Sequence, residues 1–127
     1  MPHFIVEYSA NLDGDVDFPD LFEQLANVAQ ETGVFPLGGI RIRAHRCEHF
    51  RVAEGDPENR FIQLTIKVGT GRSEETLKEV GDTLHAFFTE YLSSLFDTRY
   101  LSFGLELTEL HPTLNYKKNN IHQKLAK

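Results

Sequence analysis

The sequence lacks the features that define several large classes of protein. It has one cysteine in 127 residues, Cys47, which excludes an internal disulfide framework and is typical of the reducing cytoplasm. No apolar run approaches the roughly 20 residues of a membrane span, and no signal peptide is expected before the first predicted strand. The formal net charge is −6, with no long basic run. We therefore expect neither nucleic acid nor a membrane as a partner.

Two segments resemble ligand-binding motifs but lack a decisive feature. His45 and His49 flank Cys47, but alternation predicts a strand there, which would hold the two imidazoles about 13 Å apart. No metal site is expected, and Cys47 is interpreted as a small apolar filler. Residues 69–73 (GTGRS) are too short for a phosphate-binding P-loop and lack its terminal Lys-Ser/Thr pair.

Hydrophobic spacing predicts four strands and two helices in a single domain, residues 1–127. Asp17 and Ser73 are suitable N-caps for the two helices, and Gly33 suits the end of the first. One apolar stripe predicts that the second helix is long and continues to Phe96. The strands are expected at residues 2–7, from about 40, at about 60–68 and at about 101–107.

The order of these elements predicts an α+β fold with two layers. Strand–helix–strand units recur at residues 2–53 and 60–110, and a polar tail, residues 111–127, is expected over the surface or a neighbour. Right-handed crossovers place both helices on one face of a four-stranded sheet. A ferredoxin-like domain has the same element order and remains an alternative. The second sheet face, expected to carry Tyr8, Phe61, Arg41 and Arg43, is half apolar and predicts subunit contact.

Pro2 occupies an unusual place, at the first position of the first strand. Removal of Met1, which a small second residue favours, would leave a secondary amine fixed in a ring. Such an amine could act as a general base if apolar burial or nearby positive charge lowered its pKa. The alternative is that Pro2 only starts the strand, a position that tolerates a missing N–H group.

Three arginines are candidates for binding an anion. Arg41 and Arg43 project from one face of the second predicted strand, with Cα atoms about 6–7 Å apart. Arg72 lies at a helix start, where backbone N–H groups and the helix dipole favour an anion. Arginine binds carboxylates in a bidentate manner. The alternative for Arg41 and Arg43 is pairing with acidic neighbours on an exposed face.

Four segments in order resemble the 5-carboxymethyl-2-hydroxymuconate isomerase family of the tautomerase superfamily. The resemblance extends from Pro2 to about His122, and the second half also resembles a 4-oxalocrotonate tautomerase subunit. Residues 46–59 diverge from the family pattern. The four segments are PHFIVEYS (2–9), FPLGGIRIR (35–43), GTGRS (69–73) and ELHPTLNY (109–116).

The resemblance implies a homotrimeric cytoplasmic enzyme of aromatic (homoprotocatechuate) degradation that needs no cofactor or metal. It implies Pro2 as the proton-transfer base, with Arg41 and Arg72 binding and polarising an anionic polycarboxylate. Arg43 also has a counterpart arginine and is a further candidate for substrate binding. The implied reaction converts 5-carboxymethyl-2-hydroxymuconate to its conjugated oxo isomer. Two alternatives remain: another superfamily activity on an unsaturated oxoacid, and a trimeric binding protein without turnover.

Overall fold

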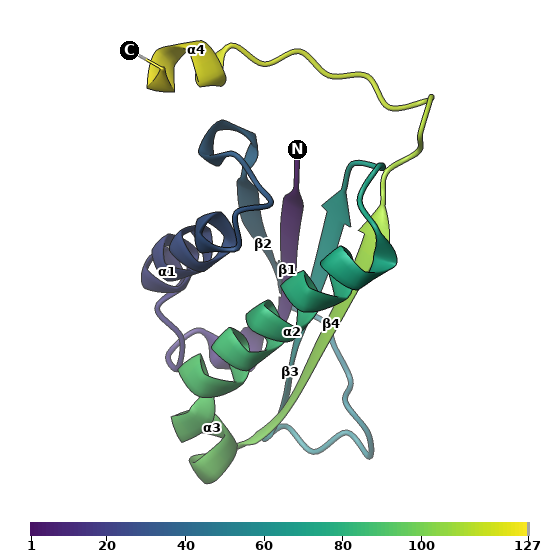
Figure 1. Cartoon of the computed structure of the whole chain (residues 1–127). Helices are drawn as coiled ribbons and strands as arrows, with labels where there is room; N and C mark the ends of the chain where they lie inside the picture. The colour runs from purple at the N-terminus through teal and green to yellow at the C-terminus, as the bar shows by residue number, and fades with distance from the viewer. Residues whose placement is uncertain (127) are drawn as a thin grey trace.

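The computed structural model describes residues 1–126, which form a sheet with its main helices packed on one face (Figure 1). No helix in this range is both long and apolar enough to cross a membrane. The elements in chain order are β1 (His3–Ser9), η1 (Ala10–Leu12), α1 (Phe18–Glu31), η2 (Leu37–Gly39), β2 (Arg41–Cys47), β3 (Asn59–Val68), α2 (Glu74–Tyr91), α3 (Ser93–Thr98), β4 (Tyr100–Glu109) and α4 (Ile121–Leu125).

The sheet topology confirms the predicted tandem β-α-β units. The four strands lie in the order β2-β1-β3-β4. β1 pairs with β2 in parallel, β3 pairs with β4 in parallel, and β1 and β3 join the two units as antiparallel neighbours. In a ferredoxin-like domain another strand separates the two strands of each split unit. The direct pairing of β1 with β2 therefore rules out that alternative.

The two main helices begin where the capping residues predict. The Asp17 side chain accepts a hydrogen bond from the Asp20 N–H group at 3.1 Å. Ser73 does the same for Thr76, also at 3.1 Å. Each cap satisfies a backbone donor that the first helical turn leaves without a partner. Gly33 follows α1 with a φ of 75°, a conformation that glycine adopts without steric cost.

The second helix is shorter than predicted. α2 ends at Tyr91, Leu92 leaves the helical region with φ −94° and ψ 8°, and the separate helix α3 follows. Ser93 and Ser94 begin α3, and serine competes for backbone hydrogen bonds in a way that weakens a helix interior. Leu92 is 1% exposed whereas Phe96 is 40% exposed, so the apolar stripe does not continue unbroken.

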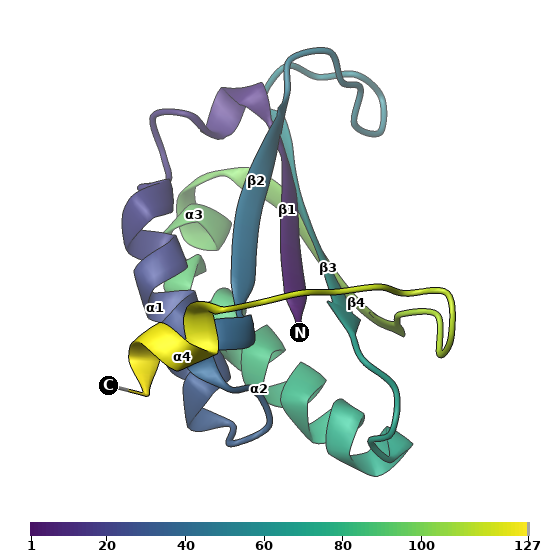
Figure 2. The same cartoon turned by 90° about the horizontal axis from the view of Figure 1, so that it is seen from above.

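The core lies between the sheet and the helices, and it includes a residue predicted on the other face. Tyr8 is only 9% exposed and stacks on Phe18 of α1 with ring centroids 4.2 Å apart. Side chains alternate along a strand, so Tyr8 shares the face of Phe4 and Val6. The placement of Tyr8 on the second face was therefore wrong. Among residues 1–126, no helix covers the second face (Figure 2).

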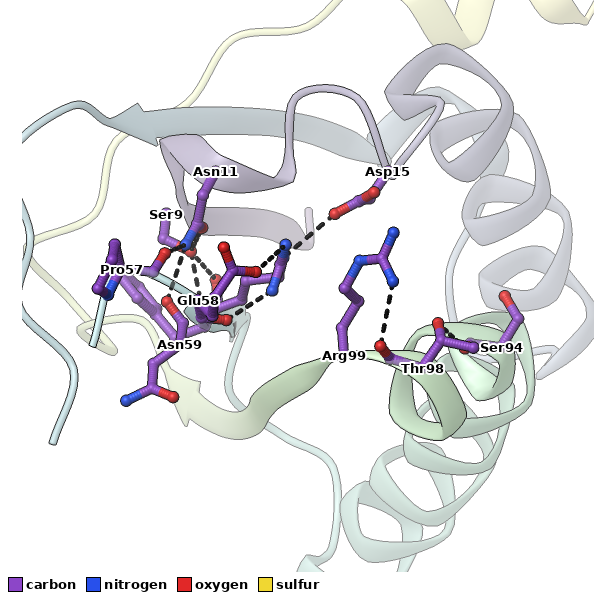
Figure 3. A network of polar contacts seen from close by, with 11 residues as sticks. Ser9, Asn11, Asp15, Pro57, Glu58, Asn59, Ser94, Thr98 and Arg99 are labelled. Carbon is purple, nitrogen blue, oxygen red and sulfur yellow. Dashed lines mark hydrogen bonds and ion pairs between the residues drawn. The ribbon is translucent and has the colours of Figure 1, made fainter. Parts of the chain in front are cut away.

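A polar network joins the loops at the end of the sheet where β1 stops (Figure 3). Arg60 is 8% exposed and binds the Asp15 carboxylate at 3.1 Å and the Glu58 carbonyl at 2.5 Å. The Asn11 amide donates to the carbonyls of Pro57 and Asn59. These contacts fix the connection after β1 against the turn before β3, far along the strands from Pro2.

The break after α2 leads to a prediction about stability. Phe88 has no exposed surface and stacks on Phe103 at 4.9 Å, so Phe88→Ala leaves a core cavity and lowers the free energy of unfolding by about 3–5 kcal/mol. The matched change Phe96→Ala, beyond the break, costs about 1 kcal/mol or less. Urea denaturation at one fixed protein concentration measures both. Equal losses of unfolding free energy in the two variants would show that the buried stripe continues to Phe96.

Candidate active site

The topology brings candidate site residues from distant segments to one edge of the sheet. β2 runs parallel to β1, whereas β3 and β4 run antiparallel to β1, so the starts of β1 and β2 lie beside the ends of β3 and β4 (Figures 1 and 2). Pro2 precedes β1, and Arg41 begins β2. Arg72 follows β3, and the tail leaves β4 at the same edge. The four segments that carry the family resemblance therefore reach one edge of the sheet.

Pro2 is buried and held by the backbone of η2 and of the start of β2. Its carbonyl accepts a hydrogen bond from the Arg41 N–H group at 3.1 Å. Gly39 is buried beside it, and a Cβ at Gly39 would lie 3.7 Å from Pro2 Cδ and 3.5 Å from Met1 Cα. The backbone of η2 thus packs directly against the start of the chain. With Met1 present the nitrogen of Pro2 is in a peptide bond, and the free amine belongs to Met1.

The surroundings of this amine favour its neutral form. Partial burial lowers the pKa of the Met1 amine below its ordinary value of 8.0, because a charged group loses hydration there. The positive charges of Lys117, Arg72 and Arg41, in decreasing order of effect, lower the pKa further. Cations from β2, from the β3–α2 connection and from the C-terminal tail therefore all act on the chain terminus.

Arg41 and Arg72 are held by neutral groups. Arg41 donates to the carbonyl of Gly38 at 3.2 Å. Arg72 donates to the carbonyls of Gly69 at 3.3 Å and Val34 at 3.1 Å, and its guanidinium lies 5.4 Å from the ring centre of Phe35. Within residues 1–126 neither guanidinium belongs to an ion pair. Their charge is oriented but not neutralised, which suits binding of an anion.

Arg43 has a different environment from the other two candidates. Its Nη1 atom lies 3.2 Å from Nδ1 of His3, across the β1–β2 pair on the second sheet face. Burial first, and then the charge of Arg43 and of Arg41, lower the pKa of His3 below 6.5. Arg43 is not among the charges that lower the pKa of the terminal amine. The structure thus brings Arg41 and Arg72 to the terminus and directs Arg43 toward His3.

A surface depression near this edge is not suited to an anionic ligand. Its volume is about 710 Å³, and its lining includes Arg72 but neither Pro2 nor Arg41. Three glutamates among the lining residues would repel a polycarboxylate. The terminus with its three cations is therefore a better candidate site than this depression. The lining residues are Arg72, Glu74, Glu75, Leu77, Lys78, Leu107 and Glu109.

The C-terminal tail contributes residues that the sequence did not indicate. The tail crosses the site edge and ends in α4, which packs against η2 (Figure 2). The Asn119 amide donates to the Gly38 carbonyl at 2.9 Å, the same carbonyl that Arg41 contacts. Lys117 lies two residues earlier. The tail has no hydrophobic periodicity, so only its path in the fold reveals that Lys117 lies near the terminus.

Different arginines act on the terminal amine and on His3, which leads to a prediction about titration. Replacing Arg72 by Gln removes a cation that lowers the pKa of the terminal amine, so this pKa rises, while that of His3 stays within error. Replacing Arg43 by Gln has the converse effect, a higher pKa for His3 and an unchanged amine. NMR titration of the amine nitrogen and of the imidazole measures both. If the pKa values of the amine and of His3 both shifted in each variant, Arg72 and Arg43 would not act on separate groups.

Comparison with known proteins agrees with the family resemblance. Residues 2–125 match the sequence profile of a family described as 5-carboxymethyl-2-hydroxymuconate isomerase. The 5-carboxymethyl-2-hydroxymuconate Delta-isomerase of Escherichia coli is 40% identical over 122 residues, covering 96% of this chain and 97% of that protein.

Solved structures show the same relationship. The crystal structure of a 5-carboxymethyl-2-hydroxymuconate isomerase from Deinococcus radiodurans R1 has a TM-score of 0.91 at 38% identity, covering 99% of this chain and 95% of that chain. A fused 4-OT symmetric trimer shares the fold at a TM-score of 0.65 and 16% identity, covering 92% and 94% of the two chains. This chain is an isomerase and belongs to the 5-carboxymethyl-2-hydroxymuconate isomerase family.

Proposed function

We propose that this isomerase converts 5-carboxymethyl-2-hydroxymuconate to 5-carboxy-2-oxohept-3-enedioate, with Pro2 as the proton-transfer base. The substrate follows the names of the relatives. The observation that carries the mechanism is the terminal amine, partly buried near Lys117, Arg72 and Arg41, all of which lower its pKa. The setting would be cytoplasmic degradation of homoprotocatechuate.

Removal of Met1 would transfer this environment to the nitrogen of Pro2. Proline is small enough at the second position to favour removal, and Pro2 is more deeply buried than Met1. A free secondary amine is more basic than an ordinary α-amino group, whose pKa is about 7.7–8.0. Burial and like charge would counter that basicity by lowering the pKa of the amine, which increases the neutral fraction that can accept a proton.

The proposed reaction is an internal redistribution of one proton and two double bonds. Neutral Pro2 takes the proton of the 2-hydroxyl group, and the C2–O bond becomes a carbonyl. The C2=C3 double bond moves to C3=C4, and the electrons of C4=C5 form a bond from C5 to a proton that Pro2 returns. The product keeps every atom of the substrate, and Pro2 ends neutral. No oxidant or reductant takes part.

Arg41 and Arg72 would stabilise the charge that develops during this transfer. Negative charge accumulates on the 2-oxo and 1-carboxylate oxygens once the hydroxyl proton has left. A charge-assisted hydrogen bond to such an oxygen contributes about 1.5–3 kcal/mol. Both guanidinium groups are already oriented by backbone carbonyls, so little reorganisation is needed when the charge appears.

The role of Pro2 leads to a prediction about activity. Pro2→Ala, with Met1 removed, leaves a primary amine at a less rigid terminus and lowers kcat by about 10²–10⁴-fold, the usual contribution of a general base. An ultraviolet assay of 5-carboxymethyl-2-hydroxymuconate, together with the intact mass, measures activity and the state of the terminus.

A chain with one extra residue before Pro2 is the matched control for the amine. It keeps the proline ring but converts its nitrogen to an amide, and it is expected to lose activity as Pro2→Ala does. Full activity with the amide would remove Pro2 as the base. A free Pro2 without turnover in the unmodified enzyme would instead show that the substrate is a different unsaturated oxoacid.

We also infer that three copies of the chain assemble through the second sheet face. This face carries Ile5 and Phe61, both partly buried, among mostly polar side chains, and no helix of residues 1–126 covers it. An uncovered sheet face with apolar side chains is typical of an interface. The fused 4-OT protein that shares the fold is described as a symmetric trimer.

The trimer leads to a prediction about molecular mass in solution. The unmodified protein is expected at three times the 14.5 kDa mass of one chain, measured by light scattering after gel filtration. Ile5→Asp places a charge on the second face and is expected to shift the mass toward one chain. Glu23→Lys on the exposed side of α1 is the control and leaves the trimer intact. An unmodified monomer would overturn the inferred assembly.

A further inference from the structure

The C-terminal strap, residues 110–126, is attached at its start to the end of the sheet. The Leu110 N–H group donates to the Val68 carbonyl at 2.6 Å. Nδ1 of His111 accepts hydrogen bonds from the N–H groups of Thr113 at 3.1 Å and Leu114 at 2.8 Å, which closes a tight turn. The strap then crosses from the β4 side of the sheet to η2 (Figures 1 and 2).

The far end of the strap is attached to the loop that holds Arg41. The Asn119 amide and the Arg41 guanidinium share the carbonyl of Gly38 as acceptor. α4 then packs on η2 so closely that a Cβ at Gly38 would lie 2.6 Å from Nδ1 of His122. Anchors on both sides of the site therefore define the path of the segment between them, and Lys117 lies on this segment.

Lys117 lies on the strap segment between these anchors and carries an uncompensated charge. Its ammonium lowers the pKa of the terminal amine more than either arginine does. Within residues 1–126 it belongs to no ion pair, although the chain has a formal net charge of −6. The adjacent Lys118 is also exposed but is not among the charges that act on the amine. Two neighbouring lysines on one strap thus differ in their effect on the terminal amine.

We propose that Lys117 is a substrate-binding residue that takes the third carboxylate of the tricarboxylate substrate. This role rests on the proposed function, in which Arg41 and Arg72 hold the oxo end. Arg43 is engaged with His3 on the second face, which leaves Lys117 as the third cation at the terminus. Lys117 lies on the strap, whereas Arg41 and Arg72 are held at the sheet by backbone carbonyls. Lys117 therefore suits the far end of an extended ligand.

Binding of two unreactive acids tests this role without turnover. Propane-1,2,3-tricarboxylate and glutarate share a five-carbon dicarboxylate chain and differ by one carboxylate. Calorimetry at low ionic strength is expected to show that Lys117→Gln weakens binding of the tricarboxylate about fivefold, the size of one exposed ion pair, and that of glutarate less than twofold. Lys118→Gln leaves both affinities unchanged, and Lys117→Arg retains the preference.

Turnover gives a second readout of the same role. On the alkaline plateau, where Pro2 is neutral in every variant, Lys117→Gln is expected to raise KM about fivefold and leave kcat within about twofold. Equal weakening of both acids, equal effects at Lys118, or no binding of the tricarboxylate by the unmodified enzyme would each overturn the role. Absence of isomerisation together with selective binding of the tricarboxylate would reject the proposed reaction and keep the site.

Discussion

The register of β1 between its two neighbours is the constraint on which the rest of the structure depends. His3 lies opposite Arg41 of β2 and Lys67 of β3, so Pro2 lies beside the start of one strand and the end of another. Phe4 and Val6 have no exposed surface, and a slip of β1 by one residue would turn them out of the core and change which residue lies opposite Arg41. Core packing on one face therefore positions the charged groups at the sheet edge.

Charge is distributed unequally between the two ends of the sheet. At the end where β1 stops, Arg60 and Arg46 pair with the carboxylates of Asp15 and Asp13. At the opposite end Arg41 and Arg72 contact only neutral groups among the described residues. An acidic chain thus keeps a local cluster of free cations. In the proposed reaction the same cations attract a polyanion and keep the amine neutral, so one arrangement serves both requirements.

Local sequence signals were accurate wherever the governing interaction is short in range. The caps at Asp17 and Ser73 depend on residues three positions away, and both are confirmed. The extension of the second helix to Phe96 was wrong because periodicity in the sequence does not register the backbone break after Tyr91. Tyr8 was misplaced, although strict alternation from Phe4 would have assigned it to the core. α4 was not predicted, since five polar-flanked residues carry almost no helical signal.

The sequence by itself determined the order of elements, the alternation of each strand and the identity of Pro2, Arg41, Arg43 and Arg72 as candidates, because these follow from residue type and local spacing. Only the tertiary structure decided that β1 pairs directly with β2, that Arg43 contacts His3 rather than the terminus, and that the charge of Lys117 acts on the terminus. These three outcomes depend on contacts between residues about 40 to 115 positions apart in the chain. Such contacts arise from the packing of the whole domain and have no local pattern in the sequence.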